Sequence, residues 1–174
     1  MAWLKMFKAR KEYRCSICGK RIKKGENYYR FAPSRFAEKQ IRCINCKPSR
    51  SEMTMSDFLS QIYDIEERLA GMDYNLKDIQ DVIDELEEII NELEDLKSET
   101  EDKYYSLPDQ FQDYSPVGEL LSGRIDALDE MIEEIEELKS ELETLIDSDM
   151  SEEEKREEFE NILESINGIC YSGE

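Results

Sequence analysis

The sequence predicts a mainly α-helical protein that begins with a small cysteine-containing β module. Four of the five cysteines lie in two Cys-x-x-Cys pairs within the first 50 residues. Apolar residues then recur at helical spacing through most of the remaining chain. The net charge also changes sign, because residues 1–50 carry 15 Lys and Arg against three acids, whereas residues 51–174 carry eight against 40. We therefore divide the chain into a basic domain, 1–50, and an acidic helical domain, 51–174.

The cysteine pairs are Cys15 with Cys18 and Cys43 with Cys46. A spacing of two residues lets a tight turn direct both sulfurs at one point, and Gly19 provides permissive backbone beside the first pair. Two such pairs are typical of a tetrahedral zinc site with no open ligand position. The sequence therefore predicts one structural Zn²⁺ per chain, bound by these four thiolates. A domain this small buries too little apolar surface alone, so the metal should supply much of its folding energy.

Between the two pairs, residues 21–31 predict a β-hairpin with its turn at 24–27. The stretch "CSICGKRIKKGENYYRF…IRCINC" resembles treble-clef and zinc-ribbon modules. Its pattern CxxCGxxIxxGExYY is similar to the zinc finger at the head of small, uncharacterised phage and bacterial proteins. The resemblance covers roughly residues 13–47, implies a four-cysteine zinc finger, and carries over no activity. A basic and aromatic set around the cysteines is the candidate surface for a partner or nucleic acid: Arg21, Lys23, Lys24, Tyr28, Tyr29, Arg30, Arg35 and Arg42.

A long first helix is predicted at about 54–104, starting at a capping box formed by Thr54 and Asp57. Its apolar positions alternate steps of four and three residues over five heptads, which is typical of a coiled-coil seam. The seam comprises Phe58, Ile62, Ile65, Leu69, Met72, Leu76, Ile79, Ile83, Leu86, Ile90 and Leu93. Gly71 lies within this run and is unfavourable there by about 1 kcal/mol relative to alanine.

Two further helices follow. Pro108 ends the first helix, and Ser115 followed by Pro116 is a strong start signal for a second at about 116–147. Ser151 and Glu154 have capping-box spacing and predict a shorter third helix at about 151–168. The expected domain is a long antiparallel coiled-coil hairpin with a short third helix. The remaining cysteine, Cys170, is expected to be an apolar packing residue.

Several functional classes are disfavoured by the sequence. The chain has no histidine, which excludes Ser/His/Asp and Cys/His catalysis and every metal site that needs a histidine. It also shows no phosphate-binding glycine-rich loop, and its acidic runs are interrupted by seam residues, as on a solvated helix flank. We expect a protein that is not an enzyme. No apolar run is long enough for a signal peptide or membrane span, and the CxxC pairs suit a reducing cytoplasm, that of the host for a phage-encoded protein.

The favoured hypothesis is a zinc-finger and coiled-coil binding protein, a phage-type adaptor or inhibitor that binds a host protein, with no membrane partner. An alternative is nucleic-acid binding through the basic zinc-containing head. The acidic helices suggest two other hypotheses. One is that they imitate nucleic acid toward a basic host protein. The other is that the seam makes the chain a self-associating scaffold and therefore a homo-oligomer.

Overall fold

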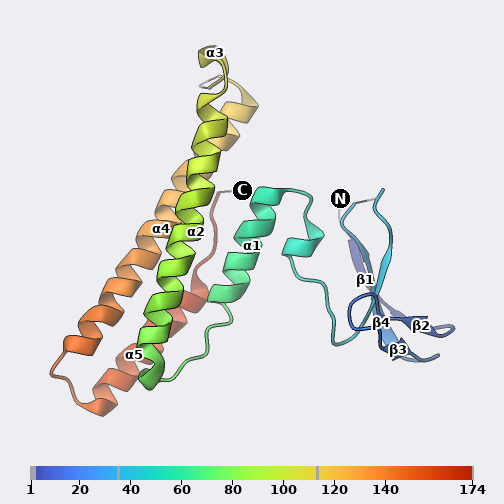
Figure 1. The fold of residues 1–174 in the computed structure, drawn as a ribbon, viewed down its shortest axis with the longest axis horizontal. Coiled ribbons are helices and arrows are strands. Elements are labelled where there is room, and N and C mark those ends of the chain that lie inside the picture. The colour runs from blue at the N-terminus through green and yellow to red at the C-terminus, as the bar shows by residue number, and fades with distance from the viewer. Residues whose placement is uncertain (1–2, 35, 113, 174) are drawn as a thin grey trace. The chain divides into compact units, whose positions relative to one another are not determined.

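The computed structural model describes residues 3–34, 36–112 and 114–173, and the chain forms two compact units, Met1–Asp64 and Ile65–Glu174 (Figure 1). The fold is mainly helical with a small β-sheet region, which confirms the predicted fold class at that level. The division between the units falls within helix α1 (Asp57–Leu69), whereas the charge pattern placed it at residue 50. Among the described residues, no helix contains a stretch both long and apolar enough to cross a membrane.

The first unit contains two small antiparallel sheets. Strands β1 (Trp3–Lys8), β4 (Asn27–Ala32) and β5 (Gln40–Cys43) form a sheet in the order β1-β4-β5. Strands β2 (Tyr13–Arg14) and β3 (Arg21–Ile22) form a two-stranded ribbon on either side of the first cysteine pair. Within the larger sheet, Tyr28 lies opposite both Phe7 of β1 and Cys43 of β5. This register places the second cysteine pair beside an aromatic row.

The expected hairpin over residues 21–31 is wrong in its pairing. Its turn is present, with Gly25 at a φ of +95° and the Glu26 amide donating to the Lys23 carbonyl over 3.1 Å. However, β3 pairs with β2, and β4 pairs with β1 and β5. The reason is that β1 provides a partner matched over six residues to β4, whereas β3 offers only two residues. Hydrogen bonds along the full length of β4 therefore go to strands elsewhere in the sequence.

The single helix expected at 54–104 is also wrong, because two helices occupy that range. Helix α1 begins at Asp57, where the Ser56 hydroxyl, rather than that of Thr54, accepts the amide of Leu59 over 3.3 Å. A non-helical connection then leads through the 3-10 turn η2 (Leu76–Asp78) into α2 (Ile79–Tyr105). Gly71 and the turn-forming Asp73 and Asn75 lie in this connection, where they favour non-helical backbone.

The heptad pattern continues across that break because both helices bury the same kind of apolar stripe. Nine of the eleven seam residues are buried, and the half-buried pair, Leu76 and Ile79, marks the join between η2 and α2. Across the break, Arg68 near the end of α1 donates to Glu92 of α2 over 2.7 Å and lies 3.8–3.9 Å from two further carboxylates of α2. An ion-pair cluster thus fastens the end of α1 to α2.

The second unit is built on an antiparallel pair of long helices. Helix α2 lies beside α4 (Pro116–Asp147), as the ion pairs Lys97–Asp129 at 2.5 Å and Lys139–Glu87 at 3.6 Å require. Helix α5 (Glu152–Gly168) packs on α4 and starts with a complete capping box between Ser151 and Glu154. The buried residues of these helical interfaces include Val82, Leu86, Ile89, Leu93, Leu128, Met131, Ile135, Leu142, Leu145, Phe159, Ile162 and Ile166.

The corner between α2 and α4 contains the short helix α3 (Asp109–Gln112) and a close approach at Gly118. The Ser115 hydroxyl accepts the Gly118 amide over 3.0 Å and donates to the Phe111 carbonyl over 2.5 Å. A β-carbon at Gly118 would clash with the carbonyl oxygens of Gln112 and Phe111 and lie 2.7 Å from the Gln112 carbonyl carbon. Only glycine fits this position without moving backbone.

The C-terminal segment after α5 returns to the helical unit. Ile169 is buried, and the Tyr171 amide donates to the Glu66 carboxylate over 3.0 Å. Cys170, between them, is exposed, so the expectation that it packs in the core is wrong. Ile169 has extended backbone, with a φ of −62° and a ψ of 131°, and the side chains of successive residues in extended backbone point in opposite directions. Burial of Ile169 therefore turns Cys170 outward.

Candidate metal centre

Four cysteines of the first unit converge on one point. The sulfurs of Cys15, Cys18, Cys43 and Cys46 all lie within 4.8 Å of one another, and those of Cys18 and Cys43 are 3.7 Å apart. A tetrahedron with metal–sulfur bonds of about 2.3 Å has sulfur–sulfur edges of about 3.8 Å. The cluster therefore has the size of a tetrahedral four-thiolate site, and only a small contraction separates it from that geometry. These cysteines are close enough to bind a metal ion.

Two short turns position the ligands. In the first, the Cys15 amide donates to the Lys20 carbonyl over 2.9 Å, and the Gly19 amide donates to the Cys15 carbonyl over 3.1 Å. Gly19 has a φ of +70°, a conformation that residues with a β-carbon rarely adopt. In the second turn, which follows β5, the Cys46 amide donates to the Cys43 carbonyl over 3.0 Å. The Ser16 amide joins the two turns by donating to the Ile41 carbonyl of β5 over 2.8 Å.

The environment of the cluster shifts the pKa values of Cys15 and Cys46 in opposite directions. Burial raises the pKa of Cys15, but hydrogen bonds from the backbone of Cys43, Cys18 and Ile17 outweigh it and lower that pKa to about 6. Hydrogen bonds with the side chains of Cys43 and Cys18, together with burial, raise the pKa of Cys46 to about 12. One ionised sulfur thus opposes ionisation of the next in the same small volume. A bound cation would reverse this by compensating the negative charge of all four sulfurs.

The apolar core of this unit is built around the same cysteines. Cys15 and Cys43 are buried in one cluster with Ala9, Ile22 and Tyr28, and Cys46 packs at its edge. The Tyr28 ring packs against the Phe7 and Tyr13 rings at centroid distances of 5.9 and 5.0 Å. Because Cys15 and Cys43 are themselves core residues, binding of a metal at this cluster would couple the site to the packing of the core.

Two residues of the candidate partner surface point inward. Tyr28 is 6% exposed within the aromatic cluster just described. Arg42 is 5% exposed, stacks on the Phe31 ring at 4.7 Å, and donates to both carboxylate oxygens of Glu52 over 2.6 and 2.5 Å. Both side chains are therefore used within the fold, and neither is available for a partner or for base stacking. The pairing with Glu52, in the 3-10 turn η1 (Ser51–Met53), was not expected because that acid lies beyond the charge boundary at residue 50.

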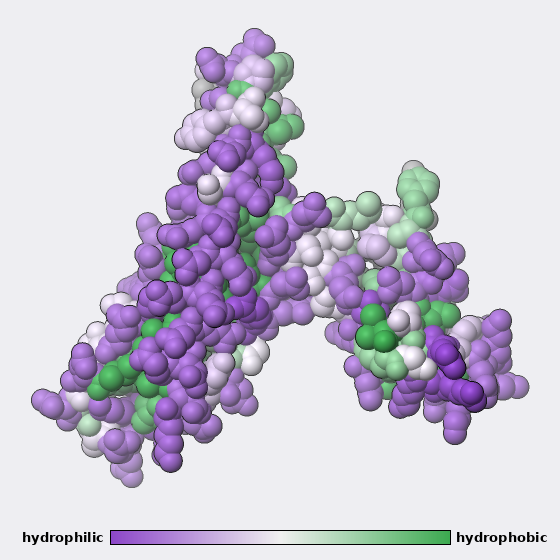
Figure 2. All heavy atoms as spheres, viewed as in Figure 1, coloured by the Kyte–Doolittle hydropathy of each residue, from purple (hydrophilic) through white to green (hydrophobic). Residues whose placement is uncertain are grey.

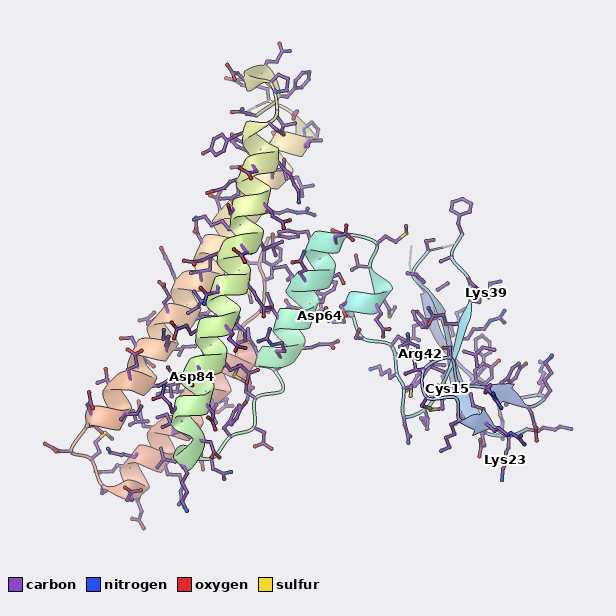
Figure 3. All side chains as sticks on the ribbon, viewed as in Figure 1. Cys15, Lys23, Lys39, Arg42, Asp64 and Asp84 are labelled. Atoms are coloured by element: carbon purple, nitrogen blue, oxygen red, sulfur yellow. The ribbon has the colours of Figure 1, made fainter. Side chains whose placement is uncertain are left out.

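The other residues of that set are more accessible. Arg21, Lys23 and Lys24 are exposed, and Figure 3 shows Lys23 at an edge of the first unit. Tyr29 and Arg30 are half-buried, while Arg35 lies outside the described residues. Sequence reasoning missed Lys8 and Lys20, which line one shallow hollow with Arg21. It also missed two exposed isoleucines, Ile17 and Ile44, one inside each CxxC turn. Their positions between the paired cysteines could have indicated that both side chains lie beside the site.

The Arg42–Glu52 pair leads to a pH prediction. The hydrogen bond from Arg42 is the largest influence on Glu52 and lowers its pKa below the usual value. A lowered folded-state pKa stabilises the fold above the unfolded-state pKa, and this contribution is lost as the pH falls through the folded-state value. We expect Glu52→Gln to destabilise the first unit by about 1 kcal/mol at pH 7, because it removes a partly exposed ion pair. The difference from wild type should shrink as the pH falls below about 4.

The measurement is urea unfolding followed by the fluorescence of Trp3, the only tryptophan in the chain, at several pH values with zinc present. Glu38→Gln is the matched control, because Glu38 is an exposed acid of the same unit. Comparing the variants at each pH cancels the shared effect of acid on the thiolates. A Glu52→Gln variant as stable as wild type at pH 7 would show that the pair contributes nothing.

Comparisons with known proteins leave the site to be interpreted from its geometry. No protein-family model, curated protein or solved structure matches the chain.

Proposed function

We propose that this chain is a non-catalytic binding protein whose first unit is held in shape by one structural Zn²⁺ and presents a metal-dependent surface to a protein partner. The supporting observation is the position of Ile17 and Ile44, which remain 59% and 55% exposed although each is adjacent to a ligand cysteine. A partner that covers neighbouring exposed aliphatic side chains removes their apolar surface from water, which favours binding. A site with four thiolates has no position for substrate, so the zinc acts structurally.

The surroundings of the two isoleucines suggest the chemistry of the partner. The sulfurs of Cys18 and Cys43, the neighbours of these isoleucines in sequence, are 3.7 Å apart, so both side chains flank one metal centre. Exposed cations, Lys20 and Arg21, follow the first turn. An apolar contact bordered by cations favours a partner surface that combines aliphatic or aromatic residues with carboxylates. On the resemblance to phage proteins, we propose a host protein as partner and the host cytoplasm as location, with the chain acting as adaptor or inhibitor.

The experiment is affinity capture from cell lysate with the zinc-loaded full chain, treated with nuclease and washed at moderate salt. The test variant is Ile17→Ser/Ile44→Ser, which leaves all four ligands in place. The matched control is Ile146→Ser, because Ile146 is an isoleucine of the second unit that is 42% exposed. We expect a defined protein that is captured by wild type and control and lost with the double variant. Identical captures by all three proteins would contradict the proposal.

Nucleic-acid binding is a second candidate, favoured by one observation. Lys8, Lys20 and Arg21 line a hollow of about 420 Å³ beside the metal centre, and Lys23 and Lys24 are exposed on the adjoining turn. Several cations around a concave surface are suited to a phosphate backbone. Against this candidate, Tyr28 and Arg42 point inward and the second unit is strongly acidic.

A fluorescence titration with single-stranded DNA at several salt concentrations distinguishes this candidate. Lys23→Glu/Lys24→Glu should reduce the slope of log K against log salt by about 0.7 for each lost phosphate contact. Lys77→Glu/Lys103→Glu makes the same change of charge at two exposed lysines of the second unit and serves as the control for net charge. Equal affinity and equal slope for the wild type and the double variant would exclude phosphate contacts by these lysines.

A further inference from the structure

A groove on the second unit lies between the C-terminal part of α4 and helix α5. Its volume is about 600 Å³, and its apolar lining consists of Leu145 from α4, Ile162 from α5 and Met150 from the connection between them. Leu145 and Ile162 are buried, whereas Met150 is 42% exposed. Figure 2 shows hydrophobic atoms among hydrophilic ones over this part of α4 and α5. The groove therefore has a buried apolar floor and one accessible apolar side chain, that of Met150.

Carboxylates surround this apolar lining. Glu137 and Glu141 border the groove from α4, and Glu158 borders it from α5. All three are exposed, and within the described part of the chain none of them forms an ion pair. The neighbouring cations are used elsewhere, because Lys139 pairs with Glu87 and the ammonium of Lys155 donates to the Ile146 carbonyl over 3.1 Å. The carboxylates at the groove thus keep their negative charge uncompensated.

This combination specifies the chemistry of an occupant. An apolar face is needed to cover Met150 above the buried Leu145 and Ile162, and positive charges on both edges of that face would meet the three glutamates. An amphipathic helix with lysines or arginines flanking an aliphatic stripe has this arrangement, and helices commonly bind grooves between two other helices. The charge of the surrounding unit also favours a cationic occupant, since residues 65–174 carry 37 acids against eight Lys and Arg and attract cations over a longer range.

We propose that the α4–α5 groove is a docking site for a cationic amphipathic helix of a partner protein. The site is separate from the metal-dependent surface proposed above, since all of its residues belong to the second unit. A chain with both surfaces is able to contact two partners of opposite charge: an acidic one at the metal centre and a basic one at the groove. The two proposals can fail independently, because neither set of variants changes residues of the other site.

The probe is a fluorescein-labelled synthetic peptide with leucines on one helical face and lysines on the other, titrated with the zinc-loaded full chain by fluorescence anisotropy. We expect saturable binding that weakens with salt. Met150→Ser should weaken it about tenfold, because the peptide then covers one less apolar side chain. Glu137→Gln/Glu141→Gln should weaken it about threefold to tenfold at low salt, because two unshielded charges at the groove are lost.

Two controls separate docking from general attraction to an acidic surface. Glu94→Gln/Asp95→Asn removes the same charge from exposed positions of α2 outside the groove and should leave affinity within about twofold of wild type. A peptide with serines in place of leucines keeps the lysines and should bind at least about tenfold more weakly. Absence of saturable binding, or equal losses from the two charge variants, would overturn the proposal. A concentration-dependent dimer that Glu137→Gln/Glu141→Gln converts to monomer would also overturn it, because a second copy would then occupy the groove.

Discussion

Replacement of Cys43 by serine in the full chain is expected to abolish stoichiometric metal binding and to unfold the first unit. The sulfur of Cys43 lies 3.7 Å from that of Cys18, and its side chain is also part of the buried cluster around Tyr28. Structural zinc contributes on the order of 10 kcal/mol to the folding of small thiolate-rich domains. That is comparable with the whole stability of an ordinary domain, so the first unit should not compensate for its loss. Chelation of the metal from wild type should have the same effect.

The readouts are metal content per chain, the fluorescence of Trp3 and far-ultraviolet circular dichroism. Wild type should retain one Zn²⁺ after gel filtration, and Cys43→Ser should retain less than a tenth of that with altered Trp3 emission. The helical signal should change little, because α2, α4 and α5 belong to the second unit. Cys170→Ser is the control and should keep the full metal content, since Cys170 lies outside the cluster. A Cys43→Ser protein with one bound zinc and unchanged fluorescence would refute the assignment of the site.

Gly118→Ala is expected to lower the free energy of unfolding of the second unit by about 1–3 kcal/mol, as overpacking of a tight site generally does. The added β-carbon would clash with the Gln112 carbonyl, and the obstacle is backbone, which cannot rotate away as a side chain can. Relief requires a shift of α3 relative to the start of α4. Such a shift would also lengthen the hydrogen bond from the Ser115 hydroxyl to the Phe111 carbonyl.

Gly123 provides the matched control within the same helix. A β-carbon there would meet nothing within 4 Å, and the residue is exposed, so Gly123→Ala should raise stability by up to about 1 kcal/mol through better helix propensity. Both variants can be followed by urea unfolding monitored by the helical signal in circular dichroism. The two substitutions are chemically identical and should have opposite signs. If Gly118→Ala also raised stability, the close approach at the corner would not exist in solution.

The signals that predicted structure well are local ones. Ser115 starts α4, and the capping box of Ser151 and Glu154 starts α5. The side chains of these three residues each accept a hydrogen bond from a backbone amide only three positions away. The convergence of the four cysteines follows from a similar local rule, since each CxxC turn directs two sulfurs together and only one long-range contact is then required. Information of this kind is contained within a few residues of sequence.

The features that were mispredicted depend on residues far apart or on balanced local preferences. The strand partner of β4 is β1, about twenty residues or more earlier in the chain, and nothing between residues 21 and 31 specifies it. Residues 70–75 interrupt the first predicted helix although the heptad spacing continues. The spacing of apolar residues indicates which side chains are buried, and a turn that keeps those side chains buried leaves the spacing unchanged. Arg42 was assigned to a partner surface from its charge alone. Its actual role requires knowledge that both Glu52 and Phe31 lie against it.

The outward position of Cys170 makes the protein convenient to label. With zinc bound, the other four thiols are metal ligands, which leaves one exposed cysteine per chain for maleimide chemistry. A dye at this position reports from the C-terminal segment of the second unit, whereas the natural fluorophore Trp3 belongs to the first. Energy transfer between Trp3 and an acceptor at Cys170 would therefore give a spectroscopic ruler between the two units without any engineered site. The same thiol calls for a reducing agent during purification, because disulfide-linked dimers formed in air would imitate genuine self-association.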